Sequence, residues 1–156
     1  MTFQLIKKDW IMNRPIEDLA RTFIDLAWNK GHFNLLRQYC TTDFHYHTTF
    51  NEQVLDFDAY VAYVKTFRTC MPDIELTIED VMNKGDHAMA YNILSGTITK
   101  PFFGLPASDK LITFTAISTL NFNKGKIESL DSLIDIASIQ RQIEAPIAVD
   151  RPLNIV

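Results

Sequence analysis

GKIESLDSLIDIASIQRQI, residues 125–143, holds the clearest structural signal in this chain. The run before it, LITFTAISTLNF at residues 111–122, is rich in β-branched and aromatic residues and contains no Gly or Pro. The sequence NKGK at residues 123–126 separates the two runs. We therefore predict a long hairpin whose second strand ends near Asp135 and leads directly into a short helix.

Apolar residues recur at helical spacing upstream of this hairpin. Residues 15–28, 33–40 and 57–71 are predicted helices, and residues 43–48 (DFHYHT) alternate like a short strand. From residue 74 the pattern changes to alternation, with predicted strands at 74–82 and 87–99 and a Pro- and Gly-bearing loop at 100–109.

Helices followed by a meander of four long strands indicate an α+β fold. Because one flat sheet cannot cover three amphipathic helices, we expect a cone-shaped α+β barrel. Its N-terminal helices would pack in a strongly curved, mainly antiparallel sheet that encloses an apolar cavity. We divide the chain into an extension (1–14), one domain (15–143) and an extended tail (144–156).

Composition excludes several classes of function. The 156 residues are 47% apolar and carry a formal charge of −4, with no window rich in Lys or Arg. This argues against nucleic acid or an anionic membrane as a partner. No secretory signal or membrane span is visible, and Cys40 and Cys70 lack metal or redox spacing. We expect a soluble cytoplasmic protein with buried thiols.

Several motifs in order resemble the SnoaL-like polyketide cyclases, within the wider nuclear-transport-factor-2-like superfamily. They are WNKG (28–31), DFHYH (43–47), MPDIELTIEDVMNKGD (71–86), SGTITKPFFGLPAS (95–108), GKI (125–127) and DIASIQRQI (135–143). The resemblance implies an enzyme without cofactor or metal that closes a ring by intramolecular aldol condensation on a polyketide ester. It places the acid/base aspartate at Asp135. Asn121 stands where the family often has His or Arg, and Asp131 replaces a common aromatic residue.

Asp135 has two interpretations. A carboxylate that faces an apolar cavity is desolvated, so its pKa rises and it can take a proton from a carbon acid. An Asp directly before IASIQRQI is also a good helix N-cap, and such a cap contributes about 1 kcal/mol without any catalysis. The sequence leaves both interpretations open.

The predicted substrate-binding residues are His47, Asn121, Asp131, Phe103 and Trp28. His47 would bind a substrate oxygen, and Asn121 would donate to a developing enolate if its strand face lines the cavity. Asp131 either shares a wall with Asp135 or is turned outward by a bulge. Phe103 either closes the cavity mouth or packs at a subunit interface. Trp28 either lines the cavity or belongs to the core.

We expect an Asp135-dependent cyclase or isomerase acting on a small hydrophobic, polyketide-like ester. The alternative is a non-catalytic protein that binds a hydrophobic metabolite at the same place. Epoxide hydrolysis ranks last, because no Arg or Lys lies in the strands near Asp131 and Asp135. An uncovered sheet face favours a homodimer.

Overall fold

The computed structural model describes residues 14–49 and 53–145. Within them, six strands form one sheet in the order β2-β1-β6-β5-β4-β3. Neighbouring strands are antiparallel except β1 and β6, which are parallel. The elements are α2 (Ile16–Asp25), η1 (Leu26–Lys30), α3 (Phe33–Arg37), β1 (Cys40–His47), β2 (Val54–Leu55), α4 (Phe57–Cys70), β3 (Glu75–Lys84), β4 (His87–Thr97), β5 (Leu111–Asn123), β6 (Lys126–Ile134) and α5 (Ile136–Glu144).

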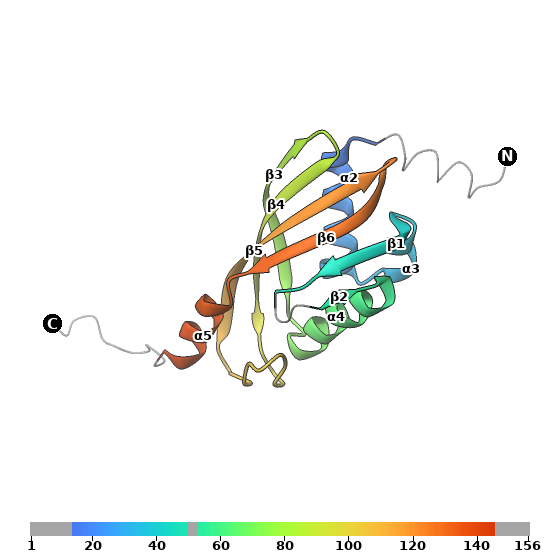
Figure 1. The fold of residues 1–156 in the computed structure, drawn as a ribbon. Helices are drawn as coiled ribbons and strands as arrows, with labels where there is room; N and C mark the ends of the chain where they lie inside the picture. The colour runs from blue at the N-terminus through green and yellow to red at the C-terminus, as the bar shows by residue number, and fades with distance from the viewer. Residues whose placement is uncertain (1–13, 50–52, 146–156) are drawn as a thin grey trace.

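The helices divide between two places in the fold. Figure 1 shows α2, α3 and α4 together on one side of the curved, unclosed sheet, and α5 beyond the end of β6, apart from them. The predicted α+β architecture, with helices packed against a curved and mainly antiparallel sheet, is confirmed. None of the helices in the described ranges is long and apolar enough to cross a membrane.

Strand alternation separates an inner face, which meets α2 and α4, from an outer face. In β5 the even-numbered residues from Ile112 to Phe122 are buried, whereas the odd-numbered ones are half-buried or exposed. The same alternation continues in β4, where Ala88, Ala90 and Asn92 are buried. Because paired residues of neighbouring strands point to the same side, the strand register extends the inner and outer faces across β4, β5 and β6.

The predicted meander corresponds to β3–β6, and the predicted helix at 57–71 corresponds to α4. Two local predictions were wrong. The helix expected at 33–40 ends at Arg37, because Cys40 already pairs with Ile127 of β6. The strand expected at 43–48 is therefore longer. The first predicted helix, 15–28, corresponds to α2 and η1, a π-helical turn that continues to Lys30 and is capped by Gly31 with a φ of 64°.

Aromatic rings fill the space between the helices and the inner face. Phe23 of α2 stacks on Tyr60 of α4 at 6.0 Å between ring centroids, and Tyr46 of β1 lies 4.7 Å from Tyr60. All three side chains have at most 1% exposure. This aromatic layer packs α2 and α4 against β1 and so determines where the two helices lie on the inner face.

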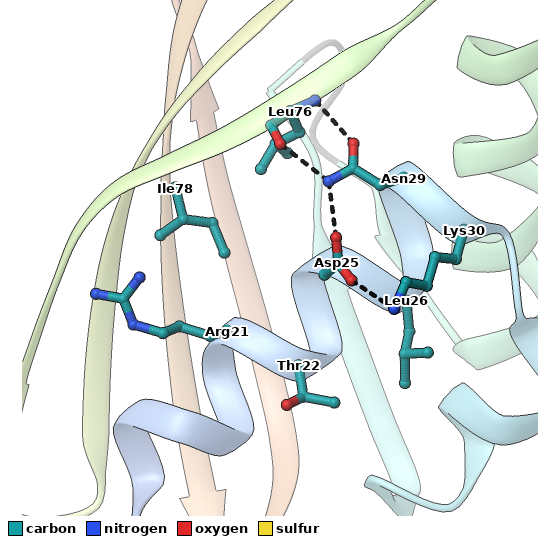
Figure 2. Close-up of a pocket in the computed structure, with 8 residues that line it drawn as sticks. All are labelled: Arg21, Thr22, Asp25, Leu26, Asn29, Lys30, Leu76 and Ile78. Atoms are coloured by element: carbon teal, nitrogen blue, oxygen red, sulfur yellow. Dashed lines mark hydrogen bonds and ion pairs between the residues drawn. The ribbon is translucent and has the colours of Figure 1, made fainter.

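Asn29 in η1 ties the first helical segment to the edge strand β3. Its Oδ1 accepts from the Leu76 amide N–H at 2.9 Å, and its Nδ2 donates to the Leu76 carbonyl at 2.9 Å. Figure 2 shows this pair, with Nδ2 also donating to Asp25. The side chain thus imitates a neighbouring strand at one residue of the sheet edge.

Replacing Asn29 by Leu should lower the free energy of unfolding by about 1 kcal/mol, because both bonds to Leu76 are lost at a partly solvated edge. Chemical denaturation measures this. Asn34→Leu, at an exposed position of α3, is the control and should change stability by less than about 0.5 kcal/mol. Equal effects of both changes would contradict a structural role of the Asn29 contact.

Candidate functional site

Asp135 follows the last residue of β6 and is the N-cap of α5. Its Oδ1 accepts from the backbone N–H of Ser138 at 3.1 Å. The residue is exposed. The hydrogen bond to Ser138 agrees with the interpretation of Asp135 as a helix cap. The interpretation as a base requires a carboxylate that is shielded from water, and the exposed Asp135 side chain is not.

His47 and Asp131 contact each other through their side chains on the outer face. They are partners in the register of β1 and β6, and His47 Nδ1 lies 2.7 Å from Asp131 Oδ1. Their side chains are 46% and 50% exposed. Asp131 thus lies on the outer face and orients the imidazole of His47. The register from Asp131 to Ile134 is continuous, so strand alternation rather than a bulge at these residues gives it this orientation.

Asn121 also lies on the outer face. Its Oδ1 contacts Nδ1 of His87, and its Nδ2 donates to Ser129 Oγ at 2.7 Å. The predicted enolate-binding role of Asn121 required its strand face to line the cavity. The buried even-numbered residues of β5 form the inner face, so the odd-numbered Asn121 does not lie on it. A period of two reveals which residues share a face, but not which face is covered.

Trp28 and Phe103 come together on the helix side of the sheet. The Trp28 ring lies 5.1 Å from Phe67 and 6.5 Å from Tyr63 between centroids. Phe103 lies 5.2 Å from Tyr63 and 5.6 Å from Phe67, and it is 36% exposed. The five predicted binding residues therefore divide into two groups on opposite faces.

Sequence reasoning missed the polar side chains of the inner face. Asn92 of β4 is 1% exposed, and its Nδ2 donates to Ser118 Oγ of β5 at 3.1 Å. Ser118 is the register partner of Ser132 on β6. The signal was a polar residue at an inward position of an alternating strand, as in the Ala88, Ala90, Asn92, Leu94 series.

Buried tyrosines add hydroxyl groups to this inner face. Burial raises the pKa of Tyr46, Tyr60 and Tyr63 above the ordinary value. The Tyr46 hydroxyl faces those of Ser132, Tyr63 and Thr48. Among the described residues no Asp, Glu, Lys, Arg or His is buried, so the interior of this part of the chain is neutral.

Neither face assembles a metal site within residues 14–49 and 53–145. His45 and His47 share the outer face, with ring centroids 5.5 Å apart, but no group of three His, Cys, Asp or Glu is close enough to hold an ion there. Cys40 is a buried free thiol, and burial raises its pKa to about 12.

A separate cleft of about 390 Å³ lies between the α2–η1 segment and β3 (Figure 2). Its polar atoms are largely occupied within the protein: Asp25 pairs with Lys30 at 3.2 Å, and Asn29 bonds Leu76. Asn29 and Lys30 hold the pKa of Asp25 below its ordinary value. We therefore interpret this cleft as a structural contact between the α2–η1 segment and β3.

The model of the SnoaL-like polyketide cyclase family matches residues 18–143. This chain belongs to that family. The polar and aromatic inner face described above lies within the matched residues, as does Asp135. A search of curated proteins finds no match.

Solved structures of similar fold include IdmH, a candidate polyketide cyclase from Streptomyces antibioticus. It is 17% identical with a TM-score of 0.75, and the match covers 85% of this chain and all (100%) of IdmH. A candidate SnoaL-like cyclase from a Jannaschia species is 20% identical, with a TM-score of 0.72 and coverage of 86% and 98%. A candidate polyketide cyclase from Bacillus cereus is 27% identical, with a TM-score of 0.66 and coverage of 80% and 77%.

The buried tyrosines predict a loss of stability in alkali. Since their pKa values are raised in the folded state, the unfolded chain loses its phenolic protons first. Stability should be complete below the ordinary tyrosine pKa of 10.0 and should fall as the pH rises above it. Chemical denaturation between about pH 8 and pH 11 measures the slope.

Proposed function

We propose that this chain is a cofactor-independent enzyme of the cyclase or isomerase type, acting on a small hydrophobic, polyketide-like ester. Membership of the SnoaL-like family supports the reaction class. The observation that carries the proposal is the wall of flat rings on the helix side, where Trp28, Phe103, Tyr63 and Phe67 gather. Such rings pack well against a flat conjugated substrate.

Asp135 is our candidate for the acid/base group. The helix cap uses its Oδ1, and we assign the proton transfer to Oδ2. In the proposed reaction the carboxylate takes a proton from the carbon beside the ester. The enolate then forms a C–C bond to a second carbonyl within the same molecule, and the resulting alkoxide takes the proton back. One C–H bond is replaced by one O–H bond.

One observation favours a second function, non-catalytic binding of a hydrophobic metabolite. Asp135 is exposed and already acts as a cap, and no carboxylate is buried among the described residues. A binding protein would need only the aromatic wall and neutral hydrogen-bonding groups. The two functions differ in whether the carboxylate of Asp135 is required.

Asp135→Asn separates them, because Asn is as good an N-cap as Asp and removes only the charge. If the enzyme function is right, this change should lower the rate of deuterium exchange at the methylene of methyl naphthylacetate at least about 100-fold. Proton NMR in heavy water follows the exchange. Binding of the ester should change little.

The matched control is Asp56→Asn at the N-cap of α4, where Asp56 accepts from Ala59 N–H at 2.8 Å. It makes the same chemical change at a cap and should leave exchange unaffected. If the wild-type chain binds the ester but does not accelerate exchange, the binding function replaces the enzyme function.

We further propose a homodimer formed through the outer face of the sheet. Met82, Met89, Tyr91 and Leu133 are large apolar side chains with 43–65% exposure on this face. The register places Met82 beside Met89, and Ile117 joins Tyr91 to Leu133. A second copy that places the same patch opposite would remove these side chains from water.

Leu133→Glu should convert the dimer to a monomer, because it places a charge in the apolar contact. Light scattering coupled to size-exclusion chromatography measures the mass. Ala62→Glu, at an exposed position of α4 on the helix side of the sheet, is the control and should remain dimeric. A wild-type monomer at high concentration would refute the proposed interface.

A further inference from the structure

Two polar atoms in the interior lack the hydrogen bond that a buried polar group normally makes. The Tyr46 hydroxyl and Asn92 Oδ1 are buried side-chain atoms without a hydrogen-bond partner. Their residues are 0% and 1% exposed. The hydroxyls of Ser132, Tyr63 and Thr48 face the Tyr46 hydroxyl but do not reach hydrogen-bonding geometry with it.

Both atoms belong to a polar belt that crosses an otherwise apolar inner face. The belt consists of Asn92, Ser118, Ser132, Tyr46 and Tyr63. Large apolar side chains lie on both sides of it along the same strands, namely Ile112, Phe114, Leu120, Leu130 and Leu94.

The belt costs stability in the ligand-free chain. A buried donor or acceptor without a partner costs more than a made hydrogen bond contributes, so an apolar residue of similar shape would be at least as stable there. Asn92 illustrates this, since Ser118 bonds its Nδ2 and leaves the other amide atom unpaired. Protein stability is commonly sacrificed in this way where a ligand supplies the missing partner.

We infer that Tyr46 and Asn92 bind the two oxygen functions of a neutral ligand on the inner face: Tyr46 donates to a carbonyl oxygen, and Asn92 Oδ1 accepts from a hydroxyl. This rests on the proposed function and adds to it two residues that select for a carbonyl and a hydroxyl group on the ligand. Both residues determine specificity by binding, and neither replaces the proposed base.

The surroundings select a neutral ligand. No charged side chain in the described ranges is buried beside the belt, and an ionised ligand would lose its hydration without gaining a counter-charge. β5 and β6 lie between β4 and β1 in the sheet, so a ligand that meets both residues must span these two strands.

Thermal unfolding without ligand tests the first half of the inference. Tyr46→Phe removes only the unpaired hydroxyl and should raise the melting temperature by about 2–4 °C. Tyr39→Phe makes the same change at a largely buried tyrosine whose hydroxyl is not one of the buried unpaired atoms of the described residues, and as the matched control it should not raise the melting temperature. A lower melting temperature for Tyr46→Phe would mean that an internal water or a protein group already satisfies the hydroxyl, and would overturn the inference.

Ligand binding, measured by calorimetry with three naphthalene probes, tests the second half. Naphthyl methyl ketone offers only an acceptor and should bind about fivefold more weakly to Tyr46→Phe but equally to Asn92→Leu. Naphthol offers a donor and should lose a similar factor in Asn92→Leu. Isopropylnaphthalene offers neither and should keep its affinity in both variants.

Asn121→Leu, the same substitution on the outer face, is the control for Asn92→Leu and should not affect any probe. If all three probes bind and no variant discriminates among them, the assignment of Tyr46 and Asn92 is wrong while the hydrophobic site of the proposed function stands. If no probe binds the wild-type chain, both proposals fail together.

Discussion

The packing of α2 and α4 against one face of a continuous curved sheet is the constraint on which the rest of this structure depends. Because side chains alternate along every strand, covering one face determines the environment of each residue on β4, β5 and β6 at once. The Phe23, Tyr46 and Tyr60 rings hold the two layers together. A shift of one residue in register would exchange the inner and outer sets completely.

Two chemically different surfaces result from this division. The outer face carries groups that titrate or bear charge, such as His47 and Asp131, and they already satisfy one another. The inner face is neutral in the part of the chain that the structure describes, and it carries hydroxyl and amide groups that are incompletely satisfied. The inner face is therefore suited to binding a neutral oxygen-containing ligand, and the outer face is suited to contact with another protein surface.

Asp135 lies at the junction between β6 and α5, and its one carboxylate would have to serve both as the cap of α5 and as the proposed base. Its Oδ1 supports the first turn of α5, and α5 is in turn fastened to β5 by Gln142, whose amide donates to the Thr113 carbonyl at 2.7 Å and accepts from the Thr113 N–H at 2.9 Å. A role as base must coexist with this anchoring. Family membership supports the role, and the exposure of the residue supports the alternative.

The sequence alone determined the local elements of this chain, including the four-strand meander, helix α4 and the Asp135 cap as one alternative. These depend on periodicity and capping, which act over a few residues. The parallel pairing of β1 with β6 and the choice of the inner face were decided only by the tertiary structure. Periodicity gives the spacing of a pattern but not which of the two faces is covered, so the role of Asn121 had to stay conditional and Tyr46 and Asn92 were missed. Only the packing of distant segments determines which side is covered.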